Sequence, residues 1–279
     1  MTFGKRLSAA MRARGPLCAG IDPHAALLLE WGLDDSVAGL ERFALTATEA
    51  LAPVVAAVKP QSAFFERFGS RGVAVLERVV QTAREAGAQV VLDVKRGDIG
   101  STAQGYADAY LDPRSPIAVD AITASPYLGF GSLQPMLDTA ARHGAGVFVL
   151  AATSNKEAPE VQGARRADGS TVAGYVLDAL RRLNADAEPL GSFGAVVGAT
   201  VAGDPGERGE DFAINGPLLV PGFGVQGGSV ADLGRLFGAV LGQVLPSSSR
   251  GILRAGPQPE ALRDAALREG EALARLVGR

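Results

Sequence analysis

Two aspartates and a lysine directly follow a buried apolar run in the segment VVLDVKRGDIG, residues 90–100. The apolar run predicts a strand, and Asp93 and Lys95 stand two residues apart at its end. Because strand side chains alternate, both point to the same face, and Asp98 follows in the loop. A carboxylate and an ammonium beside a core cost free energy unless they pair. We therefore expect an ion-paired cluster that stays charged at neutral pH.

Such a cluster suits one kind of chemistry better than another. Schiff-base formation needs a neutral lysine, which alternating charges disfavour. The pattern instead favours electrostatic action on a charged substrate, with an ammonium as the proton donor. The alternative is a structural ion-pair network, since a single charge at a strand end is usually a solvated loop residue. Charges also end two earlier apolar runs, at Asp22 and Lys59. This coincidence on three consecutive runs favours an active site.

Eight short apolar runs recur along the chain, each followed by a segment of helical composition. This alternation predicts a parallel (β/α)8 barrel, a TIM barrel, formed by a single domain over residues 1–279. A doubly wound open sheet is the competing fold, but no GxGxxG follows the first run, which weakens a dinucleotide-binding interpretation. Active sites of such barrels lie at the carboxyl ends of the strands, where the charges fall. The runs are 17–22, 54–60, 89–95, 120–125, 146–153, 193–200, 217–224 and 242–248.

Three of the intervening segments show helical features. The spacing of apolar residues predicts helices over 72–88 and 171–186, the first ending at Gly87. A third is expected over 132–145, with Ser132 as its N-cap and Gly144 as its stop. The glycine- and charge-rich segments 164–174 and 202–216 are expected to be long loops.

The last two runs are followed by residues suited to a phosphate. PGFGVQGG (221–228) offers glycine backbone N–H groups and the amide of Gln226, and SSSRG (247–251) offers the guanidinium of Arg250. Loops after strands 7 and 8 are the usual phosphate site of these barrels. The alternative is that the glycines only make turns. TSN (153–155), after run 5, adds hydroxyl and amide groups, although these are also common turn residues.

Composition excludes several classes of protein. The 279 residues carry a net charge of −3, so no broad basic surface for nucleic acid or membrane lipid is expected. One cysteine rules out an internal disulfide framework, and two histidines cannot form a dense metal cluster. No apolar stretch is long enough to span a bilayer, and the basic N-terminus lacks the apolar core of a signal peptide. A cytoplasmic protein is expected.

Six segments together resemble orotidine 5′-phosphate decarboxylases, in particular the longer bacterial subgroup that includes actinobacterial members. The segment LDVKRGDIGSTA carries the Asp-x-Lys-x-x-Asp pattern of that family. On its own this pattern is shared with a related sugar-phosphate decarboxylase, but the combination is specific and spans nearly the full chain. The other segments are GIDPH (20–24), VKPQSAFFE (58–66), ASPYLGFGSL (124–133), LAATSN (150–155) and VPGFGVQGG (220–228).

The resemblance implies a role for each matching residue. The Lys-Asp-Lys-Asp array falls on Lys59, Asp93, Lys95 and Asp98, with Lys95 as the proton donor. Asp22 matches the residue that holds the ribose, Ser154 the one that contacts the pyrimidine, and Gln226 and Arg250 the phosphate ligands; Arg254 competes with Arg250. The family also implies a homodimer in which Asp98 and Thr102 enter the partner's site.

By the same resemblance, the reaction forms uridine 5′-phosphate, the last step of de novo UMP synthesis, and requires no cofactor or metal. Two other functions remain open. A metal-assisted sugar-phosphate decarboxylase would need a carboxylate site for Mg²⁺ where Lys59 and Lys95 supply positive charge. A non-catalytic nucleotide-binding barrel would leave the lysine between aspartates unexplained.

Overall fold

Eight parallel strands close into a barrel in the order of the chain, with β1 paired to both β2 and β8. The computed structural model describes residues 1–201, 210–223 and 228–278. This architecture confirms the predicted (β/α)8 barrel and excludes the open sheet. The strands are β1 Cys18–Ile21, β2 Ala57–Pro60, β3 Gln89–Arg96, β4 Ala121–Ala124, β5 Gly146–Ala152, β6 Phe193–Val197, β7 Leu218–Pro221 and β8 Val244–Ser248.

Each predicted apolar run coincides with one strand. Most of the runs extend beyond their strand, whereas β3 continues one residue past its run, to Arg96. The run at 54–60 begins three residues before β2. Val55 and Ala56 are almost fully buried, although they lie in a bend rather than in the sheet. Burial without strand pairing therefore lengthened the apolar pattern, because hydrophobicity reports burial and not backbone hydrogen bonds.

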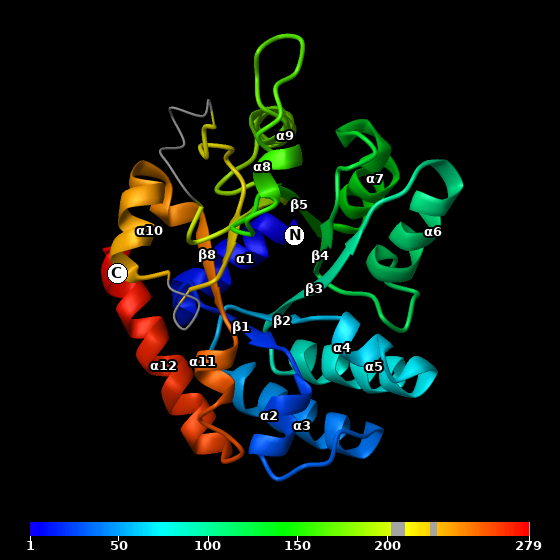
Figure 1. Ribbon diagram of the computed structural model, residues 1–279, viewed down its shortest axis with the longest axis vertical. Coiled ribbons are helices and arrows are strands. Elements are labelled where there is room, and N and C mark those ends of the chain that lie inside the picture. The colour runs from blue at the N-terminus through cyan, green and yellow to red at the C-terminus, as the bar shows by residue number, and fades with distance from the viewer. Residues whose placement is uncertain (202–209, 224–227, 279) are drawn as a thin grey trace.

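Helices surround the barrel, as Figure 1 shows. They cover the outward-facing strand residues with apolar faces, in the arrangement typical of this fold. The helices are α1 Phe3–Arg14, α2 Ala25–Glu30, α3 Val37–Leu51, α4 Ala63–Glu66, α5 Gly69–Glu85, α6 Gly100–Leu111, α7 Gln134–His143, α8 Ala158–Val161, α9 Val172–Leu183, α10 Val230–Phe237, α11 Arg250–Leu253 and α12 Pro259–Leu276, with 3₁₀ turns η1 Phe130–Leu133 and η2 Gly238–Gln243.

The three predicted helices correspond to α5, α9 and α7, and one predicted cap is wrong. Ser132 lies in η1 and its hydroxyl donates to the carbonyl of Gly129 at 2.7 Å, so it does not cap α7. A 3₁₀ turn precedes α7 directly and supplies backbone partners instead. Gly144 does end α7 in the left-handed conformation, with φ of 67°. Gly87, at φ of 79°, follows the end of α5.

Helix α1 closes the N-terminal end of the barrel. Its residues Phe3, Leu7 and Met11 are buried against one inward-facing residue from each of the eight strands. Phe3 meets the ring of Phe148 edge to face, with centroids 5.9 Å apart. A Cβ on Gly146 would lie 2.3 Å from the Phe3 ring, so this position needs glycine. With its N-terminal end filled, the barrel leaves the strand carboxyl ends as the place for a ligand.

None of the helices within the described residues is both long enough and apolar enough to cross a membrane.

Candidate active site

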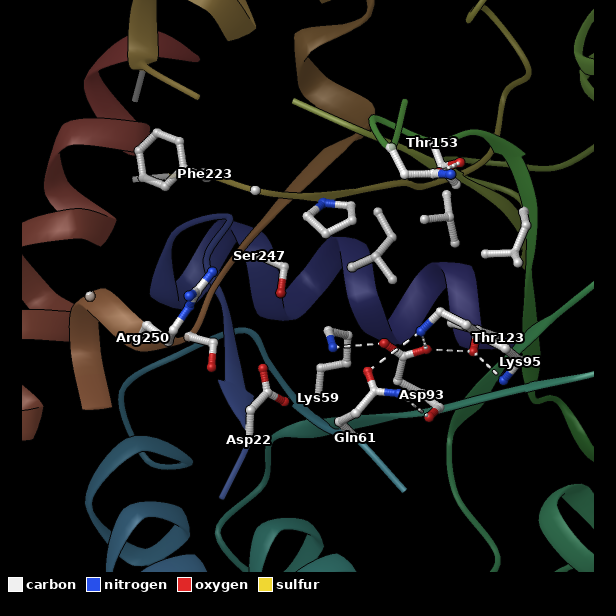
Figure 2. Close-up of a pocket in the computed structure, with 18 of the residues that line it drawn as sticks. Asp22, Lys59, Gln61, Asp93, Lys95, Thr123, Thr153, Phe223, Ser247 and Arg250 are labelled. Atoms are coloured by element: carbon white, nitrogen blue, oxygen red, sulfur yellow. Dashed lines mark hydrogen bonds and ion pairs between the residues drawn. The ribbon is translucent and has the colours of Figure 1, made fainter. Parts of the chain in front are cut away.

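A cavity of about 550 Å³ opens at the carboxyl ends of the barrel strands. Figure 2 shows Lys59, Asp93 and Lys95 gathered on one side of it, with Asp22, Ser247 and Arg250 on the other. Lys59, Asp93, Lys95 and Ser247 come from β2, β3 and β8, whereas Asp22 directly follows β1 and Arg250 begins α11. The predicted convergence of strand-end charges is therefore confirmed for Asp22, Lys59, Asp93 and Lys95.

Asp93 sits between two ammonium groups. Its Oδ2 lies 2.9 Å from Nζ of Lys59, and its Oδ1 lies 2.6 Å from Nζ of Lys95. The exposed fractions of the side chains differ sharply: 7% for Lys59 and 9% for Asp93, but 46% for Lys95. Lys59 therefore neutralises a buried carboxylate, whereas Lys95 presents its ammonium to the cavity.

Lys95 reaches Asp93 through a break in regular strand geometry. Its φ is +47°, one of two positive values among the described non-glycine residues, and the pairing of β3 with β4 shifts register between Leu92 and Arg96. A lysine in this region is strained, and such strain gathers at functional sites. The two side chains thus share a face as predicted, but a kink rather than simple alternation brings Lys95 onto the carboxylate.

Three side chains not predicted from the sequence hold this arrangement. The Lys95 N–H donates to Oγ1 of Thr123 at 2.9 Å, and the Thr123 hydroxyl donates to Oδ1 of Asp93 at 2.8 Å. The amide of Gln61 and the hydroxyl of Ser62 donate to the Asp93 carbonyl at 3.2 and 3.3 Å. Both the carboxylate and the backbone of Asp93 are therefore fixed.

The ion pairs outweigh burial in setting the charge of Asp93 and Lys59. Burial alone raises the pKa of Asp93, but Lys59 and Lys95 hold it well below its usual range. Burial alone lowers the pKa of Lys59, but Asp93 and Asp22 raise it above its usual range. Both groups are ionised at neutral pH, as the sequence predicted.

The opposite end of the cavity carries Arg250 and exposed backbone. Arg250 and Gly251 line it from the start of α11, after Ser249, and Gly222 and Phe223 line it from the segment after β7. Arg254, the competing candidate, lies outside the cavity and half-exposed, 3.9 Å from Glu30. Gln226, the other predicted phosphate ligand, lies outside the described residues.

Asp22 and His24 also line the cavity. The Oδ1 atom of Asp22 is buried and makes no hydrogen bond to the described protein atoms, as suits a group that accepts from a ligand. His24 packs against the ring of Phe64, with centroids 4.2 Å apart. Burial and nearby Arg250 lower the pKa of His24, against an opposing effect of Asp22, which favours a neutral imidazole.

Three predicted residues lie away from this cavity. Asp98 is half-buried in the loop after β3, its Oδ1 accepting from the N–H of Ile99 at 2.8 Å, and Thr102 is exposed on α6. Ser154 lies between Thr153 and Asn155, which line the cavity, but its own side chain borders a smaller neighbouring hollow. One chain alone thus does not bring Asp98 to Lys95.

Sequence reasoning passed over Thr123, Gln61, His24 and Gln162, although all four line the cavity. Thr123 stands two residues from buried Ala121 in the fourth run, so alternation could have placed it inside the barrel. Gln61 and His24 fall within segments that carried the family resemblance. No sequence signal marks Gln162, which lies in the long loop after β5.

Within the described residues, no three His, Cys, Asp or Glu side chains are grouped in a way that could hold a metal ion. Asp93 instead lies between the ammonium groups of Lys59 and Lys95.

The fold and the cavity define a barrel enzyme for a small anionic substrate, with an ion-paired lysine at one end and an arginine at the other. The chain belongs to the orotidine 5′-phosphate decarboxylase / HUMPS family, whose model matches residues 15–265.

Individual relatives agree with this assignment. The orotidine 5′-phosphate decarboxylase of Nocardioides sp. is 66% identical over 274 residues, covering 97% of this chain and 98% of its own. That of Streptomyces coelicolor is 62% identical over 264 residues, covering 95% and 94%. A crystal structure from Streptomyces avermitilis, assigned as an orotidine 5′-phosphate decarboxylase, superposes with a TM-score of 0.96 at 60% identity and covers 100% of this chain and 96% of the other. The predicted resemblance is confirmed.

Proposed function

We propose that this protein decarboxylates orotidine 5′-phosphate to uridine 5′-phosphate, the last step of de novo UMP synthesis, with Lys95 as the proton donor. The observation that carries the proposal is the Lys59–Asp93–Lys95 array in a cavity whose far end holds Arg250. The family membership and the relatives named above support the same substrate. The chain acts as one catalytic domain over residues 1–279.

The charge array fits each change in the reaction. With the substrate carboxylate near Asp93, like charges repel, and the repulsion disappears as the C6–carboxylate bond breaks and CO₂ leaves. The electron pair of that bond stays on C6. The ammonium of Lys95 faces this developing charge and then gives it a proton, so C6 gains the hydrogen and Lys95 becomes a neutral amine until it is reprotonated by water.

The lysine alone cannot supply the whole rate enhancement. One charge pair at ~4 Å is worth roughly 4 kcal/mol at an effective dielectric near 20. Slow reactions demand up to ~20 kcal/mol of barrier lowering or more. Binding energy from parts of the substrate away from C6 must contribute, and Arg250 and the loop glycines supply a phosphate site for this purpose. Asp22, whose buried Oδ1 has no hydrogen-bond partner among the described residues, accepts from the ribose hydroxyls, and the segment carrying Ser154 recognises the pyrimidine.

We also propose a homodimer in which Asp98 and Thr102 complete the partner's site. Both residues lie away from their own cavity, and Asp98 precedes Ile99, which is 62% exposed. The adjacent loop after β4 exposes Tyr127 and Leu128. Large exposed apolar side chains on neighbouring loops mark a protein interface. A cytoplasmic location is part of the proposal, because a charged nucleotide does not cross a bilayer unaided.

The test is turnover by the purified protein. Incubation with orotidine 5′-phosphate is expected to change the ultraviolet absorbance of the pyrimidine as uridine 5′-phosphate forms, with or without a chelator. Loss of activity in the chelator would favour the metal-assisted sugar-phosphate reaction. Nucleotide binding without turnover would favour the non-catalytic barrel.

A further inference from the structure

The long loop between β5 and α9 sends one side chain back to the cavity. Gln162, at the end of α8, is half-buried and reaches Thr153, nine residues earlier at the end of β5. Its backbone is held at both sides: its N–H donates to the Ala158 carbonyl at 2.8 Å, and its carbonyl accepts from the N–H of Ala173 at 3.0 Å. Gln162 is therefore a fixed bridge between α8, α9 and the cavity wall.

The amide of Gln162 binds Thr153 twice. Its Oε1 accepts from the Thr153 backbone N–H at 2.7 Å, and its Nε2 donates to the Thr153 hydroxyl at 2.7 Å. A backbone N–H can only donate, so the oxygen of the amide must face it and the nitrogen must face the hydroxyl. The orientation of this amide is thus set by chemistry.

The bond to Thr153 sets the direction of a chain of hydrogen bonds. Because the Thr153 oxygen accepts from Gln162, its own hydrogen is free to donate to Oδ1 of Asn155, which lies 2.6 Å away. The Nδ2 of Asn155 then faces Glu157 at 3.0 Å. Each group in the chain has one permitted role, so Gln162 determines which atoms of Thr153 and Asn155 remain for a ligand.

The other side of this segment is packed against backbone. A Cβ on Gly198 would lie 2.7 Å from Cβ of Ser154, and the Gly198 N–H donates to the Ala152 carbonyl at 2.7 Å. The segment 153–155 is therefore held between Gly198 and Gln162. Of these two contacts, the one on the Gln162 side is made by a side chain.

We propose that Gln162 is a positioning residue that presents the segment 153–155 to the base of the nucleotide, and so contributes to affinity for the pyrimidine rather than for the ribose phosphate. This inference rests on the proposed function. It gives the long loop after β5 a part in base recognition.

The first test measures how the Gln162→Ala variant turns over orotidine 5′-phosphate and how it binds two further ligands. Uridine 5′-phosphate carries the base, and ribose 5-phosphate lacks it. Loss of two hydrogen bonds is expected to raise KM for orotidine 5′-phosphate about 10-fold and to weaken uridine 5′-phosphate binding by a similar factor, since about 1.4 kcal/mol is tenfold. Binding of ribose 5-phosphate and kcat should stay within about 3-fold. Arg165→Ala is the matched control, because the Arg165 side chain donates to the carbonyl of Gly169 within the same exposed loop. It should leave the KM, the kcat and the binding of both other ligands unchanged.

A second variant separates positioning from simple packing. Gln162→Glu keeps the size and the acceptor for the Thr153 N–H, but its other oxygen cannot donate. The Thr153 hydroxyl must then turn toward it and release Asn155. We expect this variant to lose uridine 5′-phosphate affinity to the same degree as Gln162→Ala. The double variant Thr153→Val, Gln162→Ala should lose little more of this affinity than either single variant.

The outcomes distinguish this inference from the proposed function. A wild-type protein that does not decarboxylate orotidine 5′-phosphate overturns the proposed function, and the inference with it. A wild-type protein that is active, with Gln162→Ala binding uridine 5′-phosphate normally or losing ribose 5-phosphate equally, overturns the inference alone. The inference is also overturned if Gln162→Glu binds uridine 5′-phosphate like the wild type, or if Gln162→Ala changes the thermal stability and no binding constant.

Discussion

The backbone N–H of Lys95 donates to the Thr123 hydroxyl at 2.9 Å, on the strand next to its own. That hydroxyl donates in turn to Oδ1 of Asp93 at 2.8 Å, the same oxygen that Nζ of Lys95 contacts. Thr123 therefore ties the strained backbone of Lys95 to the carboxylate that its side chain binds. A buried hydroxyl of this kind fixes geometry because it accepts from one group and donates its only hydrogen to the other.

Thr123→Val is expected to loosen this link without changing the volume. The Lys95 N–H and one Asp93 oxygen lose a partner, which should lower the free energy of unfolding by about 1–3 kcal/mol. Turnover should fall roughly 10-fold as the ammonium loses its fixed position. Thr123→Ser restores the hydroxyl and should recover most of the activity. Urea denaturation and steady-state kinetics measure the two effects, and equal activity in Val and Ser variants would contradict the link.

Lys95→Ala should abolish turnover while leaving the fold intact. The change removes both the proton donor and the cation that faces the carbanion, so kcat/KM should fall by at least about 10³-fold. Asp93 keeps its partners Lys59 and Thr123, so thermal stability should change little. Lys5→Ala, at the opposite end of the barrel, is the control. Under the structural alternative, Lys95→Ala would lose stability and keep appreciable activity per folded molecule.

The strand-end charges could be predicted from the sequence, whereas their supports could not. Asp22, Lys59, Asp93 and Lys95 each follow an apolar run, and parallel strands in a barrel bring such positions to one rim. The positive φ of Lys95 could not be predicted from the sequence, because glycine is the residue type that usually indicates such a backbone conformation. Gln162 meets Thr153 across an irregular loop with no periodicity, and the failed Ser132 cap shows that a suitable residue type does not fix local backbone.

Arg250→Ala should weaken binding of orotidine 5′-phosphate far more than binding of orotidine, which lacks the phosphate. A charge-assisted bidentate contact is worth about 1.5–3 kcal/mol or more, so KM for the phosphorylated substrate should rise roughly 10- to 100-fold. Arg254→Ala should change the KM of neither substrate, because Arg254 faces Glu30 outside the cavity. Equal losses for both substrates, or a larger effect of Arg254→Ala, would contradict the assigned role.

Asp93 should make stability depend on pH at the acid end. Its pKa in the folded protein lies below the unfolded value of 3.8, so its contribution is complete above about pH 4 and is lost as pH falls below it. Asp93→Asn should remove this acid-limb contribution and cost about 3–5 kcal/mol at neutral pH, because Lys59 becomes a buried unpaired charge.

The residual stability of Asp93→Asn should increase with pH, since burial without Asp93 favours the neutral form of Lys59. Urea denaturation from pH 3 to 10 measures both effects. Asp34→Asn, at an exposed position before α3, is the control and should leave the wild-type pH dependence in place. A wild-type acid limb in Asp93→Asn would contradict the assigned contribution.

The proposed sharing of sites between chains can be tested by mixing two damaged proteins. Lys95→Ala and Asp98→Ala should each be nearly inactive, and a two-fold dimer makes the exchange of Asp98 reciprocal. In a mixed dimer one site carries both changes and the other carries neither. Random exchange of equal amounts makes about half the dimers mixed, so activity should return to about a quarter of wild type. If each site is built from one chain, every site stays damaged. No recovery after subunit exchange has been confirmed independently would therefore remove Asp98 from the partner's site.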